Sequence, residues 1–277
     1  MRRKCLSYAA VVLICFPLAI AASDIQAQGS APRLTAQQIV DKNVAARGGL
    51  AAWRAVQTLE MKGKMQAGGN NRTSFSAPGT KKEGALPARP ADQVELPFVW
   101  DLQRGRKQRL EIQFNGQTSI QVYDGTHGWK LRPFLNRHQV ENYTPDELKA
   151  SAAQADLDGL LIDYAAKGSK VELAGVDQVF GRSAYNLLVT DKNGNARHDW
   201  VDAENFLEVK VEGTPRRLDG KYHPVASYPR DYRSVNGLMI PFVTETAVDG
   251  VKDTEKIEIE TIVSNPKLDD KRFAMPR

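Results

Sequence analysis

Residue types that could carry acid–base or metal chemistry are few in this sequence and lie far apart. The four histidines are His127, His138, His198 and His223. None has a second histidine at the spacing of a metal site, although Asp124 stands near His127 and Asp199 directly follows His198. Both pairs lie beside turn signals, where aspartate and histidine are ordinary solvated residues. The histidines therefore predict neither catalysis nor a bound metal.

Motifs for nucleophilic or phosphate chemistry are absent from the sequence. It has no Gly-x-Ser-x-Gly elbow, no His-Glu-x-x-His helix and no glycine-rich phosphate loop. Two carboxylate pairs occur, Asp156 with Asp158 and Asp269 with Asp270. Both have the pattern of turn and cap residues, and nothing in the sequence places them at the separation that glycoside hydrolysis needs. We therefore expect a protein that is not an enzyme and that binds no cofactor. A hydrolase would need a histidine, such as His127 or His198, and a carboxylate that meet in a cleft.

Large apolar side chains form the more informative set. They recur at every second position of strand-like segments and along one side of helical segments, so they are expected to face inward. Two interpretations stay open: the side chains fill a solid core, or a curled sheet leaves room for an apolar guest. On the second interpretation, the residues that line the ligand cavity are Trp53, Trp100, Leu110, Ile112, Phe114, Ile120, Val122, Trp129, Leu131, Leu157, Leu161, Tyr164, Trp200 and Phe242.

From Thr58 onward the chain reads mainly as strands. Leu59 and Met61 alternate with polar residues, and this period of two continues through most of the sequence. Short turn signals separate the runs: Asn115-Gly116, Asp124-Gly125, Asn193-Gly194, Asn236-Gly237 and Asp249-Gly250. Strands that are neighbours in sequence are therefore expected to pair antiparallel. A long meander of this kind curls, which predicts a barrel or a half-barrel with an apolar inner face.

The central part of the chain interrupts the strands with a helical pattern. Thr144 and Glu147 form a capping box, and apolar residues then follow at helical spacing. Gly159 marks a break within this pattern, so we predict two short helices over residues 144–168. Their apolar stripes need burial, which makes this segment a helical lid over the inner face of the sheet.

Two segments before the main run of strands also differ from it. Thr35 and Gln38 form a second capping box, which predicts an N-terminal helix, and a short helix follows over Leu50–Val56. These helices are expected to join the lid. Residues 67–93 are rich in Gly, Pro, Ser, Asn and Lys without any periodicity, and predict a long mobile loop. Such a loop is either a disordered insertion or a functional lid.

The N-terminal segment has the layout of a secretory signal peptide. Residues 2–4 are basic, Tyr8–Ala22 is an apolar run, and small residues follow. The run is shorter than a membrane span normally needs, and polar residues come directly after it. Cleavage fits after Ala21 or after Ala27, and we favour Ala27, which gives a signal peptide over residues 1–27. The mature chain is therefore expected outside the cytoplasm.

Cleavage would change the cysteine content and the charge. Both cysteines, Cys5 and Cys15, lie in the segment that is removed, so the mature chain is expected to have no disulfide and no thiolate metal site. The formal net charge of +5 falls to +3 with the loss of three basic residues and one acidic residue. So balanced a charge gives no reason to expect a nucleic-acid partner.

Several segments together resemble the periplasmic outer-membrane lipoprotein-sorting protein homologues, which are relatives of the LolA lipoprotein carrier superfamily. The similarity covers nearly all of the mature chain. The segments that carry it are QQIVDKNVAARGGLAAWRAVQTLEMKGKM, YDGTHGWKLRPF, AAQADLDGLLIDYAAKG, GRSAYNLLVT with DAENFLEVKVEG, DYRSVNGLMIPF, and IEIETIVSNPKLDDKRFAMP.

This resemblance implies a single LolA-like domain over residues 28–277, with an incomplete antiparallel β-barrel and a helical lid. It implies a hydrophobic cavity that carries a lipid or an acylated lipoprotein across the periplasm, in a monomer that exchanges cargo with inner- or outer-membrane transfer proteins. It also implies an arginine that keeps the lid closed, for which Arg104, Arg106 and Arg109 are equal candidates. The alternative is a non-enzymatic envelope sensor or assembly partner that binds a lipid or a protein with the same fold.

Overall fold

The computed structural model describes residues 34–68, 93–218 and 220–277, and the structural statements below concern these residues. Its helices are α1 (Ala36–Ala46), α2 (Leu50–Ala55) and α3 (Pro145–Gln154), with 3-10 helices η1 (Pro133–Leu135) and η2 (Asp270–Phe273). Its strands are β1 (Thr58–Gly68), β2 (Gln93–Gln103), β3 (Lys107–Phe114), β4 (Gln117–Tyr123), β5 (Gly128–Arg132), β6 (Arg137–Asn142), β7 (Lys170–Val179), β8 (Arg182–Thr190), β9 (Ala196–Asp202), β10 (Glu208–Glu212), β11 (Arg216–Leu218), β12 (Lys221–His223), β13 (Val225–Val235), β14 (Leu238–Val248) and β15 (Glu255–Ser264).

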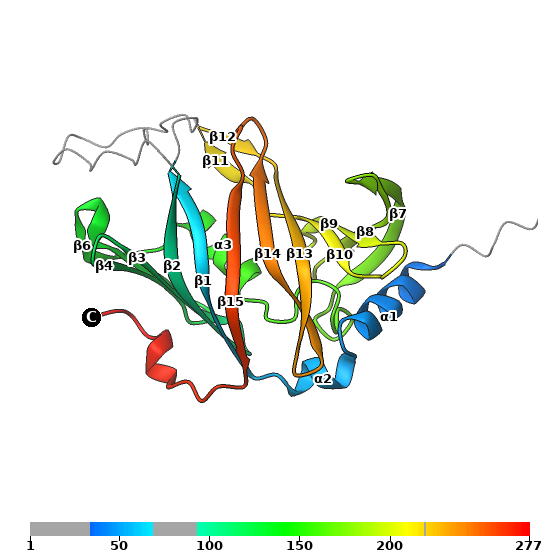
Figure 1. Ribbon diagram of the computed structural model, residues 1–277, viewed down its shortest axis with the longest axis horizontal. Helices are drawn as coiled ribbons and strands as arrows, with labels where there is room; N and C mark the ends of the chain where they lie inside the picture. Colours follow the sequence, from blue (N-terminus) through cyan, green and yellow to red (C-terminus); the bar gives the residue numbers. More distant parts are fainter. Residues whose placement is uncertain (1–33, 69–92, 219) are drawn as a thin grey trace, which may run out of the picture. The chain divides into compact units, whose positions relative to one another are not determined.

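Thirteen of the described strands form one antiparallel sheet, in the order β6-β5-β4-β3-β2-β1-β15-β14-β13-β10-β9-β8-β7. The sheet is curled but not closed, because β6 and β7 are its two edges and do not pair (Figure 1). Strands β11 and β12 form a separate hairpin between β10 and β13. The predicted mainly β fold with an incomplete antiparallel barrel is confirmed. Strands pair in sequence order except that β1 pairs with β15, β10 pairs with β13, and β6 and β7 do not pair.

The predicted hairpin turns have the backbone that their residues favour. Asn115 and Gly116 both have positive φ angles, 50° and 71°, and join β3 to β4. Asn236 and Gly237, with φ angles of 49° and 83°, join β13 to β14. Two successive left-handed residues match the right-handed twist of the flanking strands, which is why Asn-Gly predicts this turn.

Both predicted capping boxes are present. The side chain of Thr35 accepts from the backbone N–H of Gln38 at the start of α1, and Thr144 accepts from that of Glu147 at the start of α3. The second half of the predicted helical lid is different, because residues 155–168 form successive turns rather than a helix. Gly159 and Asp163 have φ angles of 77° and 56°, and left-handed residues interrupt a right-handed helix. The prediction of a second lid helix was therefore wrong.

Residues 144–168, which we call the lid segment, belong to the crossover between the two edges of the sheet. The chain leaves the edge strand β6, passes through α3 and the turns, and enters the opposite edge strand β7. Figure 1 shows α3 within the hollow of the curved sheet. Gln108 of β3 donates to the carbonyl of Ser151, and Lys130 of β5 pairs with Glu147. These contacts hold α3 against the concave face.

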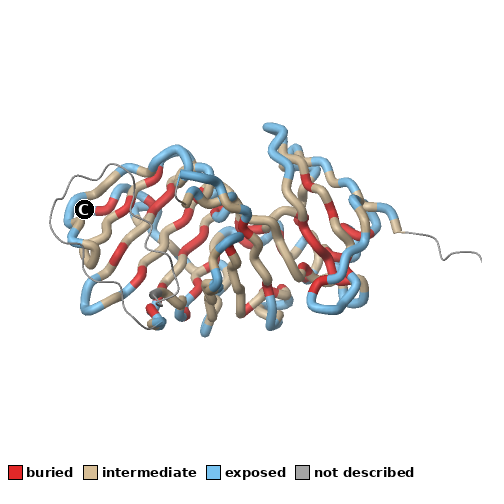
Figure 2. Tube along the Cα trace, turned by 90° about the horizontal axis from the view of Figure 1, so that it is seen from above, coloured by how far each residue is buried: buried red, intermediate tan, exposed pale blue. Residues whose placement is uncertain are grey.

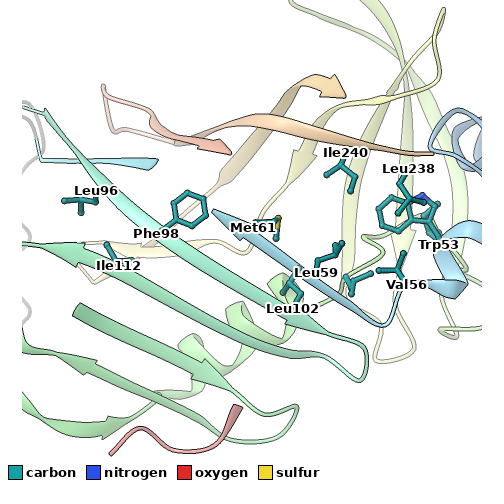
Figure 3. Packing of buried hydrophobic residues seen from close by; sticks show 12 residues of the cluster. Trp53, Val56, Leu59, Met61, Leu96, Phe98, Leu102, Ile112, Leu238 and Ile240 are labelled. Carbon is teal, nitrogen blue, oxygen red and sulfur yellow. The ribbon is translucent and has the colours of Figure 1, made fainter. Parts of the chain in front are cut away.

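Two apolar clusters account for most of the burial along the concave face. In the first, Trp53 and Val56 pack with Leu59, Met61 and residues of β2, β3 and β14 (Figure 3). In the second, Ile39 and Val40 of α1 pack on β8 and β9. The lid segment joins both clusters, through Leu157 and Ile162 in the first and through Leu161 in the second. Figure 2 shows that buried residues gather along the strands, whereas exposed residues gather at the turns.

Some predictions concern residues that the structure does not describe. The signal peptide over residues 1–27, and with it the domain boundary, stays a prediction. The same holds for most of the loop predicted over residues 67–93, although its flanks β1 and β2 pair from Thr58 opposite Gln103 to Gly68 opposite Gln93. Among the helices of the described residues, none has the length and apolar character that crossing a membrane requires.

Gly63 provides a test of how closely β1 and β15 approach. The register between these strands shifts at this residue, and an added Cβ would lie 2.0 Å from the carbonyl oxygen of Glu258. Gly63→Ala should therefore lower the free energy of unfolding by about 2 kcal/mol, because a backbone atom has to move. Gly175→Ala is the matched control, since nothing lies within 4 Å of its added Cβ in β7. If denaturant unfolding shows that both variants lose the same free energy of unfolding, the close approach of β1 and β15 at Gly63 is contradicted.

Candidate ligand-binding face

Residues that pair directly across antiparallel strands point to the same face of the sheet. Trp100 of β2 pairs with Met61 of β1 and with Leu110 of β3, so these three side chains share a face. Phe98 likewise pairs with Ile112. The lid segment packs on this face, because Leu157 and Ile162 belong to the same apolar cluster. We call it the concave face.

Part of the predicted cavity lining lies on the concave side of the sheet. Trp53 and Leu157 are buried in the first cluster with Ile112, while Trp100, Leu110 and Phe114 are half-buried at its border. Phe242 follows Ile240 by two residues in β14 and shares its face. Leu161 and Tyr164 belong to the second cluster, and the Tyr164 hydroxyl donates to Gln37 of α1. The structure thus brings these residues to one side of the sheet, under or within the lid segment.

The rest of the predicted lining points to the opposite, convex face and needs correction. These residues are Ile120, Val122, Trp129, Leu131 and Trp200. Val122 pairs with Arg109 and with Trp129, and Arg109 alternates with Leu110. Trp200 packs with Val179 and Ala184 in a third cluster. The period of two shows which residues share a face within one strand, but it does not fix which faces of neighbouring strands coincide.

The structure adds apolar residues that the predicted lining lacked. Met65 of β1, Val94 of β2, and Ile257 and Ile259 of β15 are half-buried on the concave face beside the first cluster. The alternation of isoleucine with charged residues in β15 was the available signal for the last two. Half-buried apolar side chains on one face of adjacent strands form a surface that the lid segment covers only in part, and such a surface suits an apolar ligand.

Arg104 fastens the lid segment to the sheet. Its guanidinium donates to both carboxylate oxygens of Asp158, at 2.8 and 2.9 Å, and to the carbonyls of Trp53 and Val56, each at 2.8 Å. The hydrogen bond with Asp158 is the main cause that raises the pKa of Arg104. Asp158 itself is buried. A two-pronged contact with a buried carboxylate fixes geometry as well as charge.

The other two candidate arginines make weaker or different contacts. The guanidinium of Arg106 lies 3.5 Å from Asp156, and its side chain is 53 % exposed. Arg109 lies on the convex face, where it donates to Glu111 and to the carbonyl of Arg272. Of the three arginines left open by the sequence, Arg104 is the one that holds a buried residue of the lid segment.

A second group of charged residues pairs at the edge of the lid segment. Lys167 donates to Asp156 at 2.8 Å and to the carbonyl of Gly159 at 2.7 Å. A pocket of about 220 Å³ lies here, lined by Arg104, Gly105, Arg106, Ala155, Asp156, Leu157, Asp158 and Lys167. The charged groups of this pocket pair with one another. It is therefore an anchoring network of the lid segment rather than an apolar cavity.

The two candidate acid–base pairs of the sequence differ in geometry, since Asp124 and His127 are in contact whereas His198 and Asp199 are not. His198 and Asp199 are adjacent in β9 and point to opposite faces, and the ring Nδ1 of His198 lies 2.6 Å from the side-chain oxygen of Asn186. Asp124 accepts from the backbone N–H groups of Thr126 and His127, as a turn residue does, and its Oδ2 also lies 3.5 Å from Nδ1 of the exposed His127 ring. Partial burial by itself would raise the pKa of Asp124, but these hydrogen bonds to the ionised carboxylate outweigh it, so the pKa is lowered.

Replacing Arg104 tests its role as the anchor of the lid segment. Arg104→Gln leaves the buried carboxylate of Asp158 with only Lys167, whose Nζ lies 3.8 Å away, as a charged partner in the described part of the chain. Residues 155–168 should therefore open about 2 kcal/mol more easily, less than for a fully buried pair because Arg104 is partly exposed. Hydrogen exchange of the backbone amides in this segment measures the change. Arg106→Gln is the control and should alter exchange by less than about twofold. If both substitutions change the exchange rates equally, Arg104 is not the anchor of the lid segment.

Comparisons with known proteins support the fold but not a closer relationship. No protein-family model and no curated protein matches the sequence. Among solved structures, a LolA superfamily protein from Nitrosomonas europaea is similar with a TM-score of 0.53 and 15% identity, covering 87% of this chain and 98% of that one. A DUF1329 family protein from Desulfovibrio piger has a TM-score of 0.52 and 13% identity, covering 86% and 97%.

A third similar structure is an outer membrane lipoprotein-sorting protein domain from Vibrio parahaemolyticus. Its TM-score is 0.51 and its identity 12%, with 85% of this chain and 94% of that one covered. All three similarities extend over most of both chains, although the sequence identities are only 12 to 15%. The curled, open antiparallel sheet with its lid segment is therefore a LolA-like fold.

Proposed function

We propose that the protein is a non-enzymatic carrier that binds a lipid, or the acyl chains of a lipoprotein, on the concave face beneath the lid segment. The observation that supports this most is the row of half-buried apolar side chains there, which includes Trp100, Leu110 and Phe114. An apolar chain needs only such a surface and no specific polar partner. Burial contributes about 0.8 kcal/mol per methylene, so ten buried methylenes supply about 8 kcal/mol, enough for roughly micromolar affinity.

The similar structures support the same class of ligand and a location in the cell envelope. One of them is named for lipoprotein sorting, and another belongs to the LolA superfamily. The proposal therefore places the mature protein in the periplasm, as a monomer that receives its cargo from one membrane and delivers it to transfer proteins at the other. No catalytic group is required for this role.

Two substitutions on neighbouring strands separate the concave face from the convex face. Leu110 of β3 and Ile120 of β4 are both half-buried, but they point to opposite faces. Leu110→Gln should weaken binding of a fluorescent fatty acid about tenfold, which corresponds to about 1.4 kcal/mol of lost apolar contact. Ile120→Gln should leave the affinity within about twofold of the unchanged protein. Fluorescence titration measures both values.

Denaturant unfolding of the two variants controls for general damage, because a fold-wide effect would lower the stability of both. Mass spectrometry of gently purified protein then shows which lipid accompanies it. A protein that binds no apolar probe and retains no lipid would contradict the carrier function, and a stable complex with an envelope protein instead would support the sensor alternative.

A further inference from the structure

Two carboxylates on the neighbouring strands β9 and β10 lie close together beneath the lid segment. Asp199 of β9 is 0 % exposed, and Glu208 of β10 is also buried. Asp199 pairs with Leu187 and Glu208 pairs with Val201, and both of these partners belong to the second apolar cluster, so the two carboxylates point to the concave side. Within the described part of the chain, no group donates a hydrogen bond to either carboxylate oxygen of Asp199. A charged carboxylate is costly in such a place.

The groups around this pair supply too little positive charge to balance two carboxylates closely. Arg47, at the end of α1, lies 3.3 Å from Glu208. Tyr232 of β13 donates its hydroxyl to the backbone carbonyl of Glu208 at 3.1 Å and is neutral. Arg197 lies two residues before Asp199 in β9 and acts on it only through the longer-range electric field. Among the described residues, Arg47 is therefore the one cation in direct contact with this pair of carboxylates, and it contacts Glu208.

The lid segment rests on this charged group. Arg47 Nη1 donates to the carbonyl of Asp158 at 3.1 Å. At the next residue, Gly159, an added Cβ would lie 3.5 Å from Arg47 Nη1 and 4.0 Å from Glu208 Oε1. The turn at Asp158 and Gly159 thus closes over the ion pair. Opening the lid segment would admit water to the carboxylates.

We propose that Asp199 and Glu208 form a proton-binding site that takes up one proton when the lid segment closes and releases it when the segment opens. This proposal rests on the carrier function proposed above, because it assumes that the lid segment opens and closes. When the lid is closed, a proton on Asp199 leaves Glu208 and Arg47 as a neutral pair. When it is open, water solvates both carboxylates and the proton is no longer needed.

The direction of the pH effect follows from this difference in bound protons. Burial raises the pKa of Asp199 well above its ordinary value, and the charge of Glu208 raises it further. The closed form therefore binds more protons than the open form above about pH 4, the ordinary range of an aspartate. Rising pH should favour the open form until Asp199 also loses its proton in the closed form.

Thiol labelling can measure this opening. The only cysteines of the sequence, Cys5 and Cys15, are replaced by serine in the full chain, so that an introduced cysteine is the only thiol. Ile162→Cys places a thiol at a fully buried position of the lid segment. Ala165→Cys places one at an exposed position of the same segment and corrects for the pH dependence of the reagent. The ratio of the two labelling rates should rise at least about tenfold from pH 5 to pH 7.

Asp199→Asn should make this ratio independent of pH, to within about twofold. Glu208→Gln is the second variant, because one remaining carboxylate can pair with Arg47 and needs no proton. A flat ratio in the unchanged protein, or an unaltered slope in both variants, would overturn the proposal. Fatty-acid binding is measured separately: a pH slope without binding would refute only the carrier function, and binding with a flat ratio would refute only the proton-binding site.

Discussion

The structure depends on one topological constraint: the chain has to cross from one edge of an open sheet to the other. Because β6 and β7 do not pair, the connection between them runs over the concave face instead of closing a hairpin. Leu157, Leu161 and Ile162 of this connection are buried there. The crossing therefore covers the apolar face of the sheet, and the left-handed residues Gly159 and Asp163 let the chain follow the surface where a straight helix would leave it.

The lid segment is held by two kinds of force with different properties. Apolar contacts join it to both clusters of the concave face, and these contacts are non-directional. Arg104 and Arg47 instead bind two groups of one residue, since Arg104 binds the carboxylate of Asp158 and Arg47 binds its carbonyl. The two arginines fix where the turn sits. The two-pronged contact of Arg104 fixes geometry, while desolvation of the buried Asp158 carboxylate offsets much of the attraction.

Local signals in the sequence predicted much of this fold, whereas relations between distant residues could not be predicted from it. The capping boxes at Thr35 and Thr144 and the Asn-Gly turns depend on residues a few positions apart. By contrast, Val122 and Trp200 were predicted on the wrong face because strand alternation does not fix how neighbouring strands align. The sequence predicts a solvated residue at Asp199, since nothing near it in the chain shows that Arg47 and Glu208 surround it. The three arginines were indistinguishable until Asp158 was placed in space.

The arrangement also suggests how a ligand could compete with the lid segment at low net cost. Lifting the lid exposes its own apolar residues and the concave face together, which costs about 2 kcal/mol for each large side chain that becomes wet. On the proposed carrier function, a bound acyl chain would cover the concave face again and give the lid residues a new apolar partner, so most of that cost would be recovered. The polar contacts of Asp158 are what an acyl chain cannot replace. In that proposal the balance between closed and loaded forms would rest on Arg104, Arg47 and the carboxylates beside them, although apolar burial would supply the larger free energy.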